Sequence, residues 1–244
     1  MTEAAAQCLA ILEERGKEAG LSFTPEQLEQ FGIYYDMLVE TNKVMNLTAL
    51  TSPEDVAVKH FIDCLTACDP DRFSGKTLID VGTGAGFPGI PLKIYCPDLK
   101  VVLLDSLAKR LRFLEDVIER LGLTDIRCEH LRAEEGGRNK AFRGKYDIVT
   151  ARAVARLSVL AEYCLPFARK GGMFIALKGS RYQEEIQEAE KALAILGGRI
   201  VKVEPAKLPG LDDGRALVWI RKVRDTPGAY PRKAGTPNKN PLGS

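Results

Sequence analysis

The 244-residue sequence lacks any apolar stretch long enough to cross a lipid bilayer. Its first residues also lack the basic and then apolar layout of a secretory signal peptide. These absences argue against a membrane-spanning or secreted protein. Hydrophobic residues (45%) and charged residues (28%) occur at fractions that are typical of soluble proteins. We therefore expect one large domain, or one domain with an appendage, in the cytoplasm and without a membrane partner.

Paired cysteines are absent as well. The sequence has no C-x-x-C motif, which argues against a zinc knuckle and against a redox dithiol. We expect no bound metal, and we interpret the scattered cysteines as small buried apolar residues in a reducing compartment. The six positions are Cys8, Cys64, Cys68, Cys96, Cys128 and Cys164.

The formal net charge is only +2, but it is unevenly distributed. Residues 1–150 contain 18 Lys and Arg against 24 Asp and Glu, whereas residues 151–244 contain 17 against 9. A basic half is compatible with a polyanionic partner. Taken alone, solvated surface charge explains it equally well.

Residues 77–91 have the composition of a nucleotide-binding turn. A short apolar strand contains Asp80, and Gly82, Gly84 and Gly86 follow before a helix that is predicted to begin near Pro88. Glycine lets the main chain approach a ligand where a side chain would collide, and a helix N-terminus adds free N–H groups and partial positive charge. The pattern favours a nucleotide-like ligand over a simple tight turn.

Two classes of cofactor use such a turn. The dinucleotide pattern G-x-G-x-x-G needs a small residue where this chain has Phe87. The pattern that begins at Asp80, acidic-x-G-x-G-x-G, is instead similar to the first motif of S-adenosylmethionine (AdoMet)-dependent methyltransferases. Asp105 ends the next apolar run, where a carboxylate accepts hydrogen bonds from ribose hydroxyls. Because NAD and AdoMet both use that position, Asp105 does not separate them.

Hydrophobic periodicity predicts three N-terminal helices and then an alternation of strands and helices. The alternation ends in two strands with no helix between them. We expect an α/β fold with a mostly parallel seven-stranded sheet, a C-terminal antiparallel hairpin and an N-terminal helical cap. A sheet that ends in such a hairpin resembles the Rossmann-like fold of class I AdoMet-dependent methyltransferases more than an NAD-binding Rossmann domain. The expected helices are 2–20, 24–42, 52–65, 88–96, 107–121, 156–169 and 181–196, and the expected strands are 77–81, 100–105, 126–130, 146–151, 172–178, 198–204 and 214–222.

The chain is expected to divide into three parts. Residues 1–72 form the helical cap, and residues 73–223 form the methyltransferase domain. Residues 224–244 contain four prolines, three glycines and four basic residues with little apolar content, so we expect a flexible tail.

Ligands of a wound parallel sheet bind beyond the carboxyl ends of its strands. Arg132, Arg152, Lys178 and Arg181 all follow predicted strands. One such cation could simply be solvated, but four together favour an anionic substrate beside the cofactor. His60 lies on a predicted apolar helix, where a histidine is more often a packed residue than a catalyst.

Missing motifs narrow the reaction. The turn after the fourth strand has neither the Asn/Asp-Pro-Pro-aromatic sequence that accompanies methylation of exocyclic amines nor the cysteine nucleophile that methylation at pyrimidine C5 requires. Guanine N7, whose lone pair is free, remains a candidate acceptor. A ribose hydroxyl also remains, because Lys178 could remove its proton.

Several segments together resemble the bacterial 16S ribosomal RNA guanine-N7 methyltransferases, also called glucose-inhibited division protein B. The similarity covers residues 24–222 and extends into the tail at residues 230–239. Its most specific parts are the glycine-rich segment that continues through Pro-Gly-Ile-Pro at 88–91 and the run Leu-Asp-Ser-Leu-Ala-Lys-Arg at 104–110. Further matching segments are 46–48, 60–63, 132–135, 151–153 and 176–179.

The resemblance implies that AdoMet is the cofactor and that 16S rRNA or the small ribosomal subunit is the substrate. It implies no general base, since guanine N7 is already nucleophilic, so no catalytic residue is assigned. We expect a monomer. The residues implied to contact AdoMet are Gly82, Phe87, Ala133, Glu134 and Arg152, to which the glycine turn adds Gly84 and the second strand adds Asp105; Asn46, His60, Arg132 and Lys178 are implied to face the RNA or to shape the methyl-transfer pocket.

Three alternatives stay open at this point. The first is a ribose 2′-O-methyltransferase with Lys178 as the base. The second is an NAD-dependent oxidoreductase, against which Phe87 and the closing hairpin argue. The third is an RNA-binding protein without catalytic activity that retains AdoMet.

Overall fold

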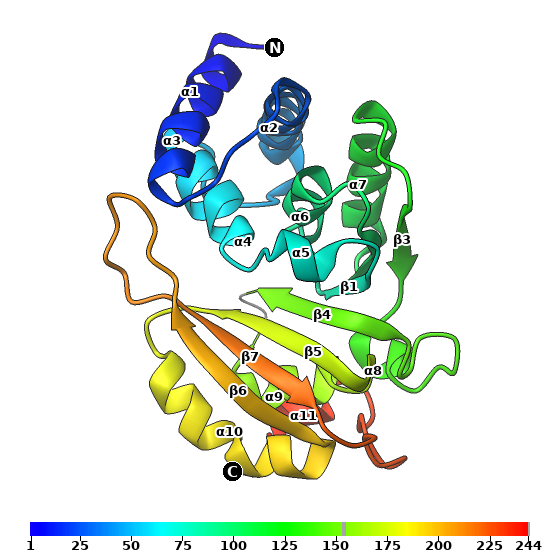
Figure 1. Cartoon of the computed structure of the whole chain (residues 1–244). Helices are drawn as coiled ribbons and strands as arrows, with labels where there is room; N and C mark the ends of the chain where they lie inside the picture. Colours follow the sequence, from blue (N-terminus) through cyan, green and yellow to red (C-terminus); the bar gives the residue numbers. More distant parts are fainter. Residues whose placement is uncertain (153–154, 244) are drawn as a thin grey trace.

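A seven-stranded sheet forms the centre of the computed structural model, which describes residues 1–152 and 155–243. The strand order is β3-β2-β1-β4-β5-β7-β6, with β1 to β5 parallel and β7 antiparallel between β5 and β6 (Figure 1). This arrangement confirms the predicted mostly parallel sheet with an antiparallel hairpin at one edge. The strands are β1 (Thr77–Val81), β2 (Lys100–Asp105), β3 (Ile126–His130), β4 (Tyr146–Arg152), β5 (Ala168–Lys178), β6 (Gly198–Pro205) and β7 (Ala216–Lys222).

Apolar residues cover both faces of the central strands. Along β1, Leu78 contributes to a core under the N-terminal helices, whereas Ile79 and Val81 contribute to a second core on the opposite face. Strands that are buried on both sides have near-continuous apolar sequences rather than alternating ones. The sheet therefore separates two hydrophobic cores, and polar residues lie at the ends of its strands.

The helices are distributed over the two faces of the sheet (Figure 1). The N-terminal helices, together with α6 and α7, share the first core, while α9 and α10 pack against each other over the second. The elements are α1 (Glu3–Glu18), α2 (Pro25–Met45), α3 (Pro53–Asp55), the π-helix η1 (Val56–Ile62), α4 (Asp63–Leu65), α5 (Pro70–Phe73), α6 (Gly89–Tyr95), α7 (Ala108–Arg120), α8 (Ala133–Gly136), α9 (Leu157–Cys164), α10 (Tyr182–Leu196) and α11 (Thr236–Lys239).

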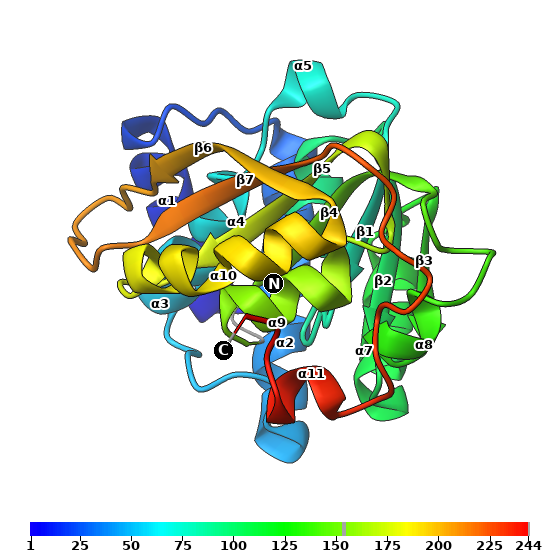
Figure 2. The same ribbon diagram turned by 90° about the horizontal axis from the view of Figure 1, so that it is seen from below.

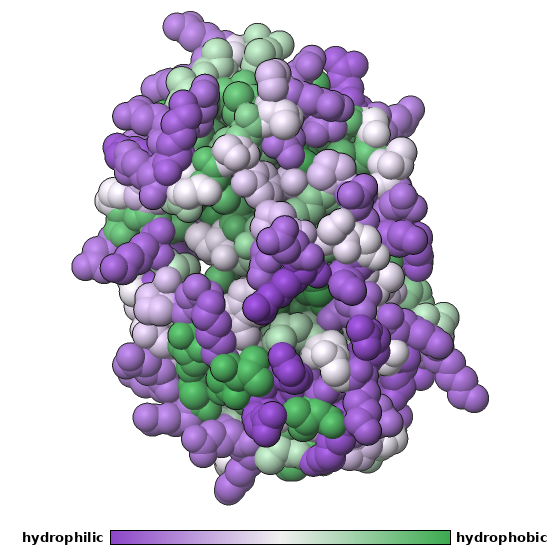
Figure 3. Space-filling view, viewed as in Figure 1, coloured by the Kyte–Doolittle hydropathy of each residue, from purple (hydrophilic) through white to green (hydrophobic). Residues whose placement is uncertain are grey.

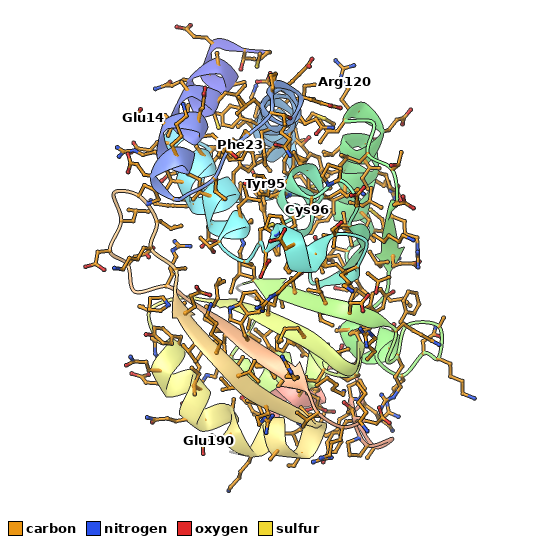
Figure 4. The ribbon with its side chains drawn as sticks, in the orientation of Figure 1. Glu14, Phe23, Tyr95, Cys96, Arg120 and Glu190 are labelled. Carbon is orange, nitrogen blue, oxygen red and sulfur yellow. The ribbon has the colours of Figure 1, made fainter. Side chains whose placement is uncertain are left out.

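Residues at the start of α2 connect this helix to the sheet domain. Thr24 and Gln27 form a capping box, and the Gln27 amide also donates to the main-chain oxygens of Ile94 and Tyr95 at 3.2 Å. The rings of Phe23 and Tyr95, labelled in Figure 4, meet edge to face at 5.6 Å. The predicted division at residues 72 and 73 stays a prediction, but these contacts make the cap continuous with the sheet's core.

The third predicted helix, 52–65, has an unpredicted geometry. Its central residues, Val56–Ile62, form a π-helix between two short α-helical turns. Wide turns of this kind occur frequently at functional sites. A 3.6-residue period in the sequence cannot distinguish the two helix types, because apolar residues line the inner face in both.

The boundary between α9 and β5 differs from the prediction. The helix was expected to reach residue 169, but it ends at Cys164 and the strand begins at Ala168. Pro166 explains the difference, because proline cannot donate the hydrogen bond that would continue the helix. The released residues pair with the adjacent strand through Ala168 and Tyr146.

The tail was expected to be flexible, and in the structure it is packed. Residues after β7 run past α8 and end beyond α11, which contacts α9 (Figure 2). The composition does not reveal this packing, because most of the anchoring contacts are hydrogen bonds to main-chain atoms of the tail.

Hydrophilic residues cover most of the face in Figure 3, with apolar residues gathered in its lower part. Within the described ranges, no helix combines the length and the apolar character needed to cross a membrane. All six cysteines are free, and four of them are buried, as the sequence suggested. Cys68 and Cys128 are half-buried.

Candidate active site

A cleft of about 590 Å³ opens where the helical cap meets the carboxyl ends of β1, β4 and β5. This is the position at which open α/β sheets bind ligands, and the size is typical of small-molecule sites. Its lining comes from four regions far apart in sequence: 47, 48, 50, 59, 60 and 63 before the sheet; 82–85 and 87 in the glycine loop; 152 and 177–180 after β4 and β5; and 213 and 215 before β7.

The glycine loop is held from below by Asp80. This fully buried carboxylate accepts hydrogen bonds from the Thr83 hydroxyl (2.7 Å), the Gly89 main-chain N–H (3.0 Å) and the Thr150 hydroxyl (3.0 Å). Burial raises the pKa of Asp80 to about 6, even though these donors favour the charged form. Asp80 therefore shapes the loop and faces away from the ligand side.

Two glycines in the loop have distinct roles. Gly84 has φ +61°, and a Cβ there would project into open space on the ligand side. Gly86 has φ +100°, and a Cβ there would lie 2.7–2.9 Å from Ile90, Tyr34 and Leu114. The first glycine leaves the cleft open, and the second lets the loop pack on the helices.

A second pocket of about 310 Å³ adjoins the cleft and shares Gly82 with it. The Asp105 carboxylate lies at its edge, where it accepts from the Gly84 N–H (3.0 Å) and the Leu107 N–H (2.9 Å). The other predicted residues in this pocket are Arg132, Ala133 and Glu134, and the unpredicted ones include Tyr163, Gly235 and Asn238.

A compact polar cluster joins the cap to β4 across the cleft. The Arg152 guanidinium forms an ion pair with Asp63 (3.0 Å), donates to the main-chain oxygen of Lys59 (3.1 Å) and lies 4.8 Å from the Phe87 ring centroid. The His60 ring stacks on Phe87 at 4.5 Å. Phe87, which counted against a dinucleotide, is thus the platform on which this cluster is assembled.

His60 is neutral in this setting. Its Nδ1 accepts from the Arg152 guanidinium (3.1 Å), and its Nε2 contacts the Thr48 hydroxyl (2.9 Å). Burial and then the Arg152 charge lower its pKa to about 3. Both ring nitrogens are engaged, so His60 positions its neighbours and has no nitrogen free to accept a substrate proton.

The predicted cations of the site are paired rather than free. Lys178 lines the cleft, but its ammonium contacts Glu185 (2.6 Å) and donates to the main-chain oxygen of Ala155 (2.8 Å). Arg181 is exposed, pairs with Glu184 and lines neither pocket. Carboxylates of the chain pair with three of the four predicted cations, and Arg132 lies in the second pocket. The expected anionic substrate beside the cofactor stays a prediction.

The structure brings together all but one of the proposed site residues. Gly82, Gly84, Phe87, Arg152, His60 and Lys178 line the cleft, and Asp105, Ala133, Glu134 and Arg132 line the second pocket with Gly82. Asn46 lines neither: it is the left-handed C-cap of α2 and is exposed. Its neighbours Leu47 and Thr48 enter the cleft instead.

Sequence reasoning assigned no role to four charged residues of the cleft, Lys59, Asp63, Asp213 and Arg215. The Asp63 carboxylate lies between Arg152 and Arg215, which is 3.2 Å away. Arg215 also pairs with Asp213, before β7. Asp63 follows His60 by three residues on the same helix and could have been found that way, whereas Arg215 reaches the cleft only through the tertiary fold.

The two joined pockets fit AdoMet. The glycine loop between them offers open space at Gly84, and Asp105 and Glu134 supply carboxylate acceptors beside the second pocket. Within residues 1–152 and 155–243, no cluster of His, Cys, Asp and Glu has the composition of a metal site.

This fold and this pair of pockets define a Rossmann-like, AdoMet-dependent methyltransferase. Among solved structures, the chain is similar to P. horikoshii TYW2 in complex with MeSAdo (13% identity, TM-score 0.50, 67% of this chain and 61% of that one). It is also similar to the Methanococcus jannaschii fibrillarin pre-rRNA processing protein (15% identity, TM-score 0.50, 64% and 69%). At such low identity these likenesses concern the fold alone.

Sequence relatives are more specific. The family model GidB, described as rRNA small subunit methyltransferase G, matches residues 27–211. Proteins named ribosomal RNA small subunit methyltransferase G are 51% identical in Lactobacillus johnsonii (91% of this chain, 95% of the relative) and 53% identical in Exiguobacterium sibiricum (93% and 95%). The chain belongs to this family, as its motifs suggested. Ala153 of the matching motif at 151–153 lies outside the described residues.

Proposed function

We propose that this protein transfers the methyl group of AdoMet to N7 of one guanine in a conserved loop of 16S rRNA. The observation that supports it best is the absence of a free general base in the described part of the cleft: both nitrogens of His60 and the ammonium of Lys178 are engaged by the protein itself. Guanine N7 needs no base, because its lone pair is available without deprotonation.

We assign the cofactor to both pockets, with its nucleoside part beside Asp105, Ala133 and Glu134 and its sulfonium end near Gly82, Gly84 and Phe87. AdoMet, when bound, supplies an electrophilic methyl group. The chain's task is then orientation, which can contribute roughly 7 to 11 kcal/mol to lowering a barrier. Arg152, held by Asp63 and stacked on Phe87, forms a rigid wall of the reaction cleft.

The RNA is proposed to enter the mouth of the cleft. The guanine must be unstacked from its neighbours to reach the cofactor, since proteins read RNA mostly at splayed bases. His60 and Lys178 line the cleft on this side, and Arg132 lines the second pocket. Asn46 lines neither pocket, so its proposed contact with the RNA would lie outside the cleft, next to Leu47 and Thr48. We propose that the protein acts as a monomer on rRNA of the small subunit in the cytoplasm.

The ribose 2′-O alternative is less well supported. A base lysine must present a lone pair to the ribose hydroxyl, but the Lys178 ammonium directs its protons at Glu185 and the Ala155 oxygen. The geometry fits a positioning role. Lys178→Ala is expected to weaken RNA binding more than AdoMet binding, and an unchanged RNA affinity together with an unchanged rate would remove Lys178 from the site.

The test is transfer of labelled methyl from AdoMet to 16S rRNA from a strain that lacks the gene, followed by nucleoside analysis. We expect label in N7-methylguanosine at a single position, recognisable by its lability to mild base. Label in a base-stable 2′-O-methyl nucleoside would support the alternative instead. Parallel assays on free rRNA and on assembled subunits identify the form of the substrate.

A further inference from the structure

Two residues near the C-terminus, Gly235 and Asn238, line the second pocket together with Asp105, Ala133 and Glu134. They lie about a hundred residues after Glu134 in the sequence and outside the region that the family model matches, 27–211. The segment from 224 to 243, here called the strap, brings them there after passing α8 (Figure 2). Its path suggests a role in the site.

Two arginines fix the first half of the strap. Arg143 donates to the main-chain oxygens of Thr226 (2.6 Å) and Tyr230 (2.8 Å). Arg138 donates to those of Ala229 (2.9 Å) and Pro231 (2.7 Å). Because these bonds use the main chain, they fix the course of the strap without depending on its side chains.

A buried carboxylate fixes the second half. Glu162 on α9 is fully buried, and it accepts from the Arg232 main-chain N–H (2.7 Å) and from its guanidinium through both oxygens (2.7–3.1 Å). Undocking the strap would break the ion pair between this buried carboxylate and Arg232, and breaking such a pair is costly. The docked position is therefore strongly favoured.

The last anchor lies in the pocket itself. The Gly235 main-chain N–H donates to Glu134 Oε1 at 2.8 Å, and its φ of +81° turns the chain into α11. A carboxylate can accept about four hydrogen bonds, so Glu134 can hold the strap and a ligand together. The side-chain amide of Asn238 is exposed at this wall and has no hydrogen-bond partner among the described residues.

We propose that the strap is the outer wall of the cofactor's nucleoside pocket and that Asn238 hydrogen-bonds the adenosine part of AdoMet. An amide offers both a donor and an acceptor, which matches the adjacent amine and ring nitrogen of adenine. The inference rests on the proposed assignment of this pocket to AdoMet. It adds a ligand-contacting residue from a segment that the motifs of the fold do not include.

The test compares Asn238→Ala with Asn240→Ala by calorimetric titration with AdoMet and with S-adenosylhomocysteine. Both asparagines are exposed, but Asn240 is held through its main-chain oxygen by Arg232, so it is a matched control. We expect Kd to rise about fivefold or more for both ligands in Asn238→Ala and to change less than about twofold in Asn240→Ala. Equal affinities in the wild type and both variants would overturn the proposal.

Proteolysis gives a second readout. Lys233 is exposed within the strap, and trypsin cleaves after it. Saturating AdoMet should slow this cleavage severalfold in the wild type and much less in Asn238→Ala; equal rates with and without AdoMet would contradict a ligand-contacting strap. If the affinity and proteolysis results are as expected but the protein methylates no rRNA, only the proposed function is refuted. If rRNA is methylated normally and Asn238→Ala binds AdoMet with unchanged affinity, only the proposed role of the strap is refuted.

Discussion

The imidazole of His60 is uncharged in the folded protein because burial and the neighbouring Arg152 guanidinium lower its pKa from 6.5 to about 3. Folding therefore favours the neutral form, and the resulting stability is present above about pH 6.5 and is lost as the pH falls towards 3. Asp80 has the opposite effect. Its pKa is raised from 3.8 to about 6, so folding favours the protonated carboxyl, and the stability that this gives to the folded protein is lost as the pH rises through 6.

This difference yields a prediction for His60→Gln, which replaces the ring by a neutral amide. When the pH falls from about 7.5 to 5, His60 becomes protonated in the unfolded chain but not in the folded protein, which lowers the free energy of unfolding by about 2 kcal/mol. The variant should lose less stability over that interval than the wild type, by about that amount, as measured by urea denaturation at both pH values. Asp80 is common to both proteins and cancels, so identical pH dependence would contradict a buried neutral His60.

Asp63 supports a second prediction. Its carboxylate, almost fully buried, compensates Arg152 and Arg215 at 3.0 and 3.2 Å. Asp63→Asn leaves Arg152 without a charged partner and Arg215 with Asp213 alone, and it should lower the free energy of unfolding by about 3 to 5 kcal/mol. Glu184→Gln, which breaks the solvent-exposed pair with Arg181, is the control and should leave the free energy of unfolding nearly unchanged. Comparable losses in both variants would show that the Asp63 cluster is not structural.

At the scale of elements, the glycine loop and the helices around it form one unit. Gly86→Ala places a Cβ within 2.9 Å of three side chains at φ +100°, and strain and crowding should together cost about 2 to 5 kcal/mol. Gly179→Ala is the control, since nothing lies within 4 Å of a Cβ there and its φ is not positive. Thermal melting should separate the two variants by several degrees, and equal melting temperatures would contradict this packing.

A comparison of the predicted helices and strands with the observed ones shows which features of the fold the sequence reveals. Short apolar runs between helical segments predicted every strand of the sheet, because burial on both faces makes strands such as β1 and β7 nearly continuous in apolar residues. The π-helical turn at Val56–Ile62 and the early end of α9 were missed, since one depends on hydrogen-bond register and the other on Pro166 inside an otherwise helical pattern.

The sequence predicted the site residues that belong to one contiguous motif. It did not predict contacts between residues that only the folded chain brings together. Gly82, Phe87 and Asp105 follow strands and were assigned to one edge of the sheet, where they lie. The pairing of Lys178 with Glu185 could not be foreseen, because residues seven apart meet only through the turn after β5. Arg215 was missed for the same kind of reason.

At the scale of the whole molecule, the chain places two pockets that share Gly82 side by side at the sheet's polar edge, and we propose that they hold the nucleoside and the reacting groups. The cap provides one wall of the cleft through Lys59, His60 and Asp63, and the sheet provides the other. Two residues of the strap, Gly235 and Asn238, line the second pocket. Charges that line the cleft are compensated internally, so the protein is arranged to orient reactants rather than to exchange protons with them.

The dependence of the single-turnover rate of methyl transfer on pH tests that claim most directly. With AdoMet and 16S rRNA both saturating, the account predicts a rate that is nearly constant between about pH 6 and pH 9, because the guanine N7 lone pair is available throughout and no protein group must lose a proton. A rate that rises about tenfold per pH unit before levelling off would contradict it, since that profile indicates a general base and a hydroxyl acceptor.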